Sequence, residues 1–322
     1  MRRMSLFRCL LGVVTFIFTS NLLAAEFNSN WIVNSQQLQA LIQQQAKVVY
    51  VVKKPGDKPV DVVPGTDARR TIPWMPKNDK DSFAIRVFSD TLTYPGGKKY
   101  PKAMPNAEQW TASMQRLGIN NGDLVIAVGN REFSARFAKT VAEYGGHAVV
   151  YNDAGNDNLL VPFALADKVS GDLVKGDFAT STEDAAPLSL DSTVGLGVDG
   201  NNQFWDIRNS AYPHGEKTKS YVYAQGTLAK ASNALKFTDL LDESGAWYKS
   251  ADEVSDILLS HFGDPKAQGN MQHVIVCDSE GLSNIVMWSA RSLGYDNVFV
   301  LAGGLHEFTM NAENHKYVAV IK

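Results

Sequence analysis

Residues 274–300 read VIVCDSEGLSNIVMWSARSLGYDNVFV, and residues 125–151 read VIAVGNREFSARFAKTVAEYGGHAVVY. The two stretches align without a gap, so that Ser134 falls on Ser283. Each contains an apolar strand, a polar loop, a helical segment that ends at glycine, and a second apolar strand. This order is typical of a parallel α/β sheet. A duplication is the simplest account of the match.

The regions upstream of the two stretches also show common features. Both carry an Asp-x-Arg motif, at residues 67–69 and 206–208, and we expect each to form a structural ion pair. Both continue into a helical segment, PNAEQWTASMQRLGI with Asn106 as the expected N-cap and KSADEVSDILLSHFG with Ser250 in that role. The upstream regions are therefore expected to correspond as well.

The segment between the halves is rich in Ser, Thr, Asp and Gly and has little periodicity, which is typical of a linker. We predict an N-terminal domain over residues 26–179, a linker over 180–200 and a C-terminal domain over 201–322.

Residues 1–25 are predicted to be a secretory signal peptide. They begin with MRRMSLFR, which has three arginines, continue with an apolar stretch and end in small residues. The apolar stretch is shorter than the ~20 residues of a membrane span. We expect a periplasmic or otherwise exported protein with no stable membrane association after cleavage.

The net charge of the chain argues against nucleic acid as a partner, and the spacing of its histidines argues against a metal site. A net charge of -3 over 322 residues provides no basic field for nucleic acid. The six histidines have no spacing typical of metal ligands, so no metal site is expected. The oligomeric state stays open.

Cys277 is the only cysteine outside the signal peptide, so the mature chain is expected to have no internal disulfide. An idle exposed thiol would oxidise in an exported protein, and we therefore expect Cys277 to be buried or used. It follows an apolar strand, at the edge of a parallel sheet where functional groups collect. The N-H groups of a following helix would favour a thiolate there. The corresponding residue of the first half is Val128.

The chain resembles the tandem-domain rhodanese-like sulfurtransferases, which include thiosulfate and 3-mercaptopyruvate sulfurtransferases. The resemblance rests on SMQRLGINNGDLVIAV, GTLAKASN and LGYDNVFVLAGGLHEF, in that order along the chain. It implies an α/β fold with two rhodanese-like domains, each a mainly parallel sheet flanked by helices. It also implies that only the second domain is catalytic.

The same resemblance implies a chemistry for Cys277. Its thiolate would take the outer sulfur of a small donor, hold it as a persulfide and pass it to a thiophilic acceptor, without a metal or an organic cofactor. The persulfide would be held by the active-site loop, which consists of Asp278, Ser279, Glu280, Gly281, Leu282 and Ser283.

The loop departs from the family pattern in length. The family has a glycine three residues after the cysteine, whereas Gly281 is four residues after Cys277. In one register Cys277 is catalytic and the loop is one residue longer. In the other, Asp278 occupies the catalytic position and Cys277 ends the strand. Both registers stay open.

The charges near the thiol also differ from the family pattern. Asp278 and Glu280 are acidic, and the substrate-binding arginines of the family are not reproduced except for Arg208. The acidic loop disfavours both a thiolate and an anionic donor. Groups that could bind substrate or shape the site are Arg208, Asp206, Lys230 and Lys249.

Two other functions compete with sulfur transfer. The acidic loop and the missing arginines suit a catalytically silent rhodanese-like module that binds a sulfur compound or a partner protein. A thiol phosphatase would have a loop of similar length, but it needs an arginine where Ser283 stands and ranks last.

Overall fold

The signal peptide predicted for residues 1–25 lies outside the part of the chain that the structure describes. In that part, no helix has the length and apolar character of a membrane span. The computed structural model describes residues 28, 30–52, 57–59, 61–73, 105–152, 161–162, 172–181, 183–197, 200–220, 222–245, 247–267 and 269–322.

The first half of the chain builds a parallel sheet with helices. Its elements are β1 (Ile32–Val33), α1 (Ser35–Gln43), β2 (Lys47–Val52), β3 (Asp61–Val62), β4 (Thr71–Pro73), α2 (Ala107–Arg116), β5 (Leu124–Gly129), α3 (Arg131–Glu143), β6 (His147–Tyr151) and β7 (Val161–Pro162). The strand order is β1-β6-β5-β2-β4, and every pairing is parallel. Strands β2, β5 and β6 are nearly continuous apolar runs, as expected for strands covered on both faces.

The second half repeats this plan with fewer strands. Its elements are β8 (Ser189–Leu190), η3 (Ser192–Leu196), β9 (Asn202–Asp206), β10 (Thr227–Leu228), η4 (Phe237–Leu240), α4 (Ala251–Phe262), β11 (Gln272–Val276), α5 (Ser283–Ser292), β12 (Val298–Leu301), α6 (Gly304–Met310), η5 (Ala312–Tyr317) and β13 (Val318–Ala319). The strand order is β8-β12-β11-β9, and every pairing is parallel. The predicted mixed α/β architecture with parallel sheets flanked by helices is confirmed.

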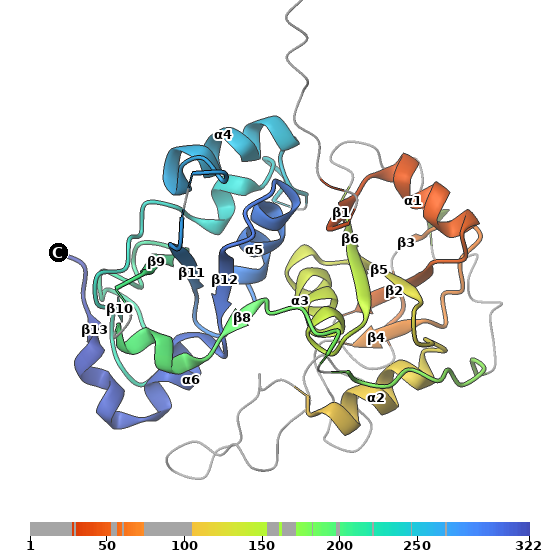
Figure 1. Ribbon diagram of the computed structural model, residues 1–322, viewed down its shortest axis with the longest axis horizontal. Coiled ribbons are helices and arrows are strands. Elements are labelled where there is room, and N and C mark those ends of the chain that lie inside the picture. Colours follow the sequence, from red (N-terminus) through yellow and green to blue (C-terminus); the bar gives the residue numbers. More distant parts are fainter. Residues whose placement is uncertain are drawn as a thin grey trace, which may run out of the picture.

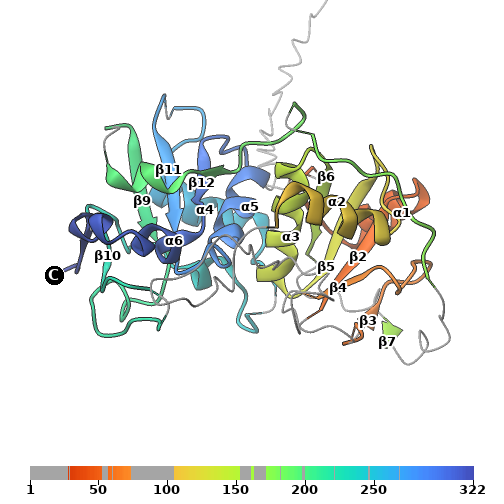
Figure 2. The same cartoon turned by 90° about the horizontal axis from the view of Figure 1, so that it is seen from below.

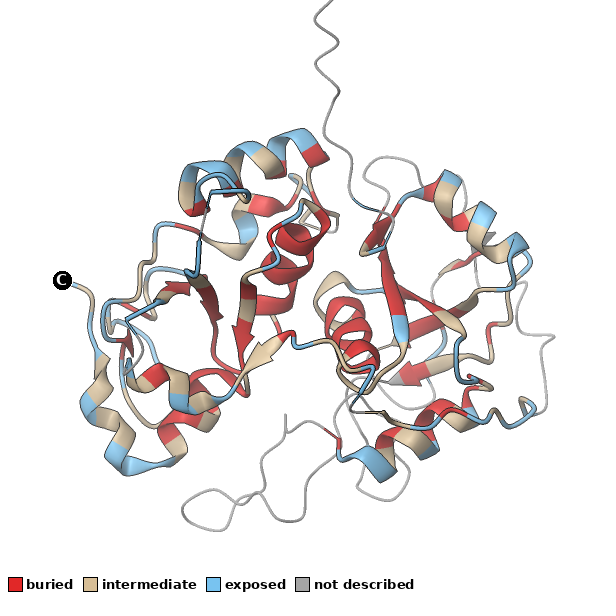
Figure 3. Cartoon of the chain, viewed as in Figure 1, coloured by how far each residue is buried: buried red, intermediate tan, exposed pale blue. Residues whose placement is uncertain are grey.

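The two halves meet along two matching helices. Helix α3 crosses over from β5 to β6, and α5 crosses over from β11 to β12, which are the two aligned segments of the sequence. Figures 1 and 2 show α3 and α5 side by side between the two sheets, and the two helices contact each other. All ten residues of α5 and the middle of α3 are buried (Figure 3). The helices that complete each half therefore also form the junction between the halves.

The predicted helix starts agree with the structure. Asn106 caps α2 and Ser250 caps α4, each with a side-chain oxygen that accepts from a backbone N-H of the first turn. In both helices the side-chain oxygen of the third residue accepts a hydrogen bond from the backbone N-H of the cap.

The predicted correspondence between the two Asp-x-Arg motifs is wrong. Asp206 ends β9, a strand that pairs with β11, whereas residues 67–69 lie between β3 and β4. Thr71 in the first half pairs with β2, and Ser232 in the second half pairs with β9 in the same way. The first motif, which lies just before Thr71, therefore corresponds to the segment just before Ser232 and not to residues 206–208. The expected ion pairs nevertheless form in both motifs. The motif is a local arrangement of three residues, and for this reason its presence does not fix a place in the sheet.

Residues 180–200, predicted to be a linker, also contribute to the second sheet. Strand β8 pairs in parallel with β12, and η3 follows it directly. The boundaries at 26–179, 180–200 and 201–322 stay predictions.

We expect His273 to make the stability of the second half depend on pH. The indole N-H of Trp205 donates to Nδ1 of His273 at 3.1 Å, and the Phe262 ring stacks on the imidazole. Burial lowers the pKa of His273 to about 4, from an ordinary value of 6.5. Between these values the unfolded chain binds a proton that the native chain does not, so the free energy of unfolding falls as the pH falls from about 6.5 to about 4.

We expect this loss to be about 1–2 kcal/mol, because His273 lies near the amino end of β11 and solvent screening reduces the full effect. Urea unfolding measured between pH 4 and pH 7 checks it. The slope attributable to this residue should be absent from His273→Gln. An unchanged slope in that variant would assign the pH dependence to other groups.

Candidate functional site

The predicted site lies at the carboxyl end of β11. Residues 278–282 form a loop between this strand and α5, beside the end of β9. The N-terminus of α6 closes the loop from the other side, since the Leu305 N-H donates to the Cys277 carbonyl at 2.9 Å and the His306 N-H to the Asp278 carbonyl at 2.9 Å. Gly304 has φ +63°, and a Cβ there would lie 2.5 Å from the Cys277 carbonyl oxygen. This close approach requires glycine.

Cys277 is buried in the loop, with 2% of its surface exposed. Its Sγ lies 3.7 Å from Oγ of Ser283, whose hydroxyl donates to the Glu280 carbonyl at 2.6 Å. Burial raises the pKa of the Cys277 thiol, and the charge of Asp278 raises it further. The backbone N-H groups of Ser283 and Ser279 oppose this rise. In this conformation the thiol is neutral at neutral pH.

Asp278 lies in a buried ion network with Arg208. Nη1 of Arg208 is 2.7 Å from Oδ1 of Asp278, and Nη2 is 2.6 Å from Oδ2 of Asp206. Nη2 also donates to the Gly226 carbonyl at 2.7 Å. Burial opposes the charge of Arg208, but its hydrogen bonds and the two carboxylates raise its pKa overall. The predicted substrate-binding arginine is thus occupied by two acidic residues of its own half.

Glu280 connects the loop to the first half. Its Oε1 lies 2.7 Å from Nζ of Lys139 on α3, and both side chains are 1% exposed. Its Oε2 accepts from the Gly303 N-H at 2.9 Å. Burial raises the pKa of Glu280, but the charges of Lys139 and Arg136 outweigh it, so the pKa lies below its usual range.

Further contacts from α3 reach the same loop and its helix. Nη1 of Arg136 donates to the Ser279 carbonyl at 3.1 Å, and the indole N-H of Trp288 on α5 donates to the Ala135 carbonyl at 2.7 Å. Lys139 also pairs with Glu143. Two cations of the first half therefore contact the acidic loop of the second half.

The sequence did not single out Arg136, Lys139 or Glu143. With Glu132 they recur at helical spacing, and such a charged row is usually solvated. The available signal was the apolar surroundings of Lys139 in SARFAKTVAE.

The structure brings only some of the predicted site residues together. Arg208 and Asp206 lie against the loop, as described above. Lys230 lies in an exposed turn with φ +67°, and Lys249 lies next to the N-cap of α4. Around the loop, the described cationic contacts come from α3 and Arg208 instead.

Both predicted registers keep a structural basis. Cys277 continues the inward alternation of β11 and packs in the core cluster with Ile275 and Ile285, as a strand-ending residue would. Its Sγ nevertheless faces the loop hydroxyl of Ser283, and Asp278 faces Arg208. The register stays a prediction.

The described residues contain no group of three or more His, Cys, Asp or Glu side chains that could hold a metal ion. That no metal or cofactor is needed stays a prediction.

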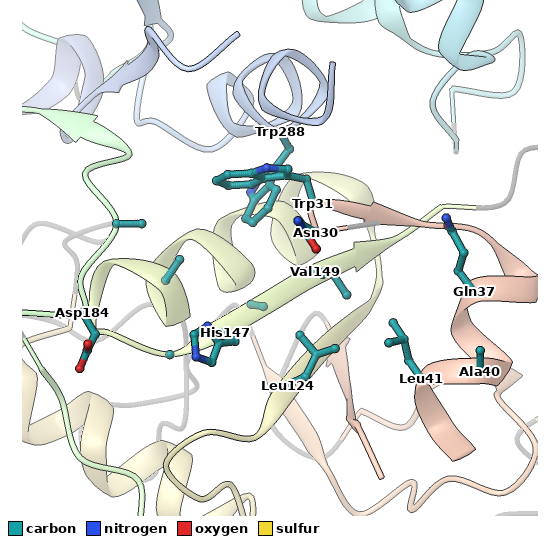
Figure 4. A pocket seen from close by; sticks show the side chains of 14 residues that line it. Asn30, Trp31, Gln37, Ala40, Leu41, Leu124, His147, Val149, Asp184 and Trp288 are labelled. Atoms are coloured by element: carbon teal, nitrogen blue, oxygen red, sulfur yellow. The ribbon is translucent and has the colours of Figure 1, made fainter. Parts of the chain in front are cut away.

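A cavity of about 630 Å³ lies at the amino ends of the strands of the first sheet, at the edge opposite their carboxyl ends. Leu124 and His147, the first residues of β5 and β6, line it, and Trp31 and Trp288 form one wall (Figure 4). The two tryptophan rings meet edge to face with centroids 4.8 Å apart. This cavity is separate from the loop at the end of β11.

Comparison with known proteins agrees with this architecture. Residues 196–311 match the Rhodanese-like domain model. No curated protein sequence matches the chain.

Three solved structures show the same fold at low identity. The Tum1 protein from Saccharomyces cerevisiae has a TM-score of 0.65 and 15% identity, covering 90% of this chain and 98% of that chain. SseA from Escherichia coli is described with the rhodanese fold and catalytic mechanism of 3-mercaptopyruvate sulfotransferases. It has a TM-score of 0.57 and 18% identity, and the match covers 85% of this chain and 98% of that chain. A 3-mercaptopyruvate sulfurtransferase from Leishmania major has a TM-score of 0.60 and 12% identity, and the match covers 86% of this chain and 74% of that chain. The chain therefore has the α/β fold of these three proteins, one of which is described with the rhodanese fold, and its residues 196–311 match the rhodanese-like domain model.

Proposed function

We propose that this protein is an exported sulfurtransferase in which Cys277 carries a sulfane sulfur. The observation that carries the proposal is the placement of Sγ at the carboxyl end of β11, beside the Ser283 hydroxyl and the loop N-H groups that oppose the rise of the thiol pKa. The rhodanese-like domain and the sulfurtransferases among proteins of similar fold support a role in sulfur transfer. The tandem arrangement of two such domains belongs to the same proposal.

The proposed reaction has two steps and needs no cofactor. In the first, the Cys277 thiolate attacks the outer sulfur of thiosulfate, the S-S bond of the donor breaks, and sulfite leaves with its electron pair. In the second, a thiophilic acceptor such as cyanide attacks the outer sulfur of the persulfide and restores the thiolate. With 3-mercaptopyruvate, the thiolate attacks the donor sulfur, the C-S bond breaks with its electron pair on carbon, and the enolate that leaves takes the proton of the donor thiol to become pyruvate.

The loop N-H groups would stabilise the charge of the persulfide. They belong to Ser279 in the loop and to Ser283, the first residue of α5, where the helix dipole favours negative charge. Because Cys277 is 2% exposed, the loop has to move before a donor reaches Sγ.

A catalytically silent module is the second candidate, and one observation favours it. Arg208 is ion-paired with both Asp206 and Asp278. An anionic donor can bind this arginine only after the pair with Asp278 is broken. In that case the second half binds a partner or a sulfur compound without a covalent step.

We expect the mature protein to gain the mass of one sulfur atom after incubation with thiosulfate or 3-mercaptopyruvate, and to lose it on reduction. Cys277→Ser should gain nothing, because the sulfur has no thiolate to attack. Intact-mass spectrometry measures both.

A reducible gain on Cys277 would also decide the register. A folded protein that gains no sulfur from either donor would contradict the proposal and favour the silent module.

A further inference from the structure

Helix α3 of the first half presents an ionic contact to the loop of the second half. Lys139 and Glu280 are joined at 2.7 Å, and each side chain is 1% exposed. The pair lies at the junction of the halves, where Figure 1 shows α3 facing α5. No part of the reaction proposed above uses either residue.

The energetics of this pair are asymmetric. A buried ion pair adds little over an apolar pair of similar shape, but a buried charge that loses its partner is strongly destabilising. Without Lys139, the Glu280 carboxylate would keep the Gly303 N-H and the more distant charge of Arg136. The Glu280 carboxylate would then have a lower free energy if it turned out of the interior and became hydrated.

Glu280 is also the residue of the loop whose backbone is strained. It has φ +69°, a conformation that side chains other than glycine rarely adopt. Its own carbonyl accepts the Ser283 hydroxyl, which contacts Sγ of Cys277. Movement of Glu280 therefore changes the surroundings of the thiol directly.

We propose that Lys139 is a positioning residue through which the first half holds the 278–282 loop closed over Cys277. This inference concerns the site of the proposed function, and its role in sulfur transfer rests on that proposal. Closure of the loop over the thiol is measurable by itself, because it depends on access to Sγ and not on any sulfur donor.

The test is the rate at which iodoacetamide, a neutral reagent, alkylates Cys277 in the native full-length mature protein, followed by intact mass. Lys139→Met should raise this rate about tenfold or more, equivalent to about 1.4 kcal/mol in the opening equilibrium. Glu280→Gln should raise it as well. The double variant should exceed the larger single effect only slightly, because both substitutions remove the same contact.

Two control variants separate a local effect from general destabilisation. Glu143→Gln removes the other partner of Lys139 but keeps the Glu280 contact, and its rate should stay near wild type. Leu38→Ala leaves a cavity in the cluster on the other face of the first sheet. It should lower the midpoint of urea unfolding without a matching rise in alkylation.

A wild-type rate in folded Lys139→Met would overturn the inference. An equal acceleration in Leu38→Ala at matched stability would overturn it too, since the effect would then be global. Faster alkylation in Lys139→Met together with no sulfur loading of the wild type would support the inference while contradicting the proposed function. Sulfur loading of the wild type without any effect of Lys139→Met on alkylation would support the proposed function while contradicting the inference.

Discussion

Arg208→Met is expected to lower the free energy of unfolding by about 3–5 kcal/mol, because it leaves two acidic residues in the interior without their cation. Asp206 is fully buried and Arg208 is 3% exposed. Methionine keeps much of the volume and supplies none of the hydrogen bonds to Asp206, Asp278 and the Gly226 carbonyl. Urea unfolding followed by tryptophan fluorescence measures the change.

The first half offers a matched control in Arg69→Met. Arg69 binds Asp67 through the same atoms that Arg208 uses to bind Asp206, and its Nη2 lies 2.7 Å from Oδ2 of Asp67. The Arg69 side chain, however, is 32% exposed. Water can replace the lost contacts there, and the loss of stability should be clearly smaller. Equal losses in the two variants would show that the contrast in burial does not govern the strength of these motifs.

The comparison of the two motifs also shows what a sequence pattern can establish. Asp-x-Arg predicted a local ion pair correctly in both halves, because the contact spans only three residues. It predicted a wrong correspondence between the halves, because a place in a sheet is set by strand pairing over the whole domain. The gapless 27-residue match was the better guide, since it carries the order of strand, helix and strand.

The candidate site was predictable only in part. Cys277 and its loop could be placed at a strand end, because the apolar run stops there. The role of Lys139 could not be predicted, since helical periodicity cannot tell a charged row that faces water from one whose cations contact the acidic loop of the other half. Nor could it show that Asp278 turns to Arg208. Both features depend on contacts between segments distant in the sequence.

Asp278→Asn is expected to speed sulfur loading from thiosulfate about tenfold or more. The Asp278 carboxylate raises the pKa of the Cys277 thiol, repels a dianionic donor and occupies Nη1 of Arg208. A neutral amide removes the first two effects and weakens the third. The rate of the one-sulfur mass gain measures the result, and the pH profile of thiol alkylation should shift to lower pH.

Asp256→Asn is the control, because it removes one negative charge from the exposed face of α4. If general charge sets the rate, both variants should accelerate alike, whereas a local effect appears in Asp278→Asn alone. Slower loading in Asp278→Asn would mean that the carboxylate assists the reaction, and it would contradict this prediction. Faster loading, absent when Cys277 is also replaced by serine, would place the sulfur on Cys277 and make Asp278 the group that restrains it.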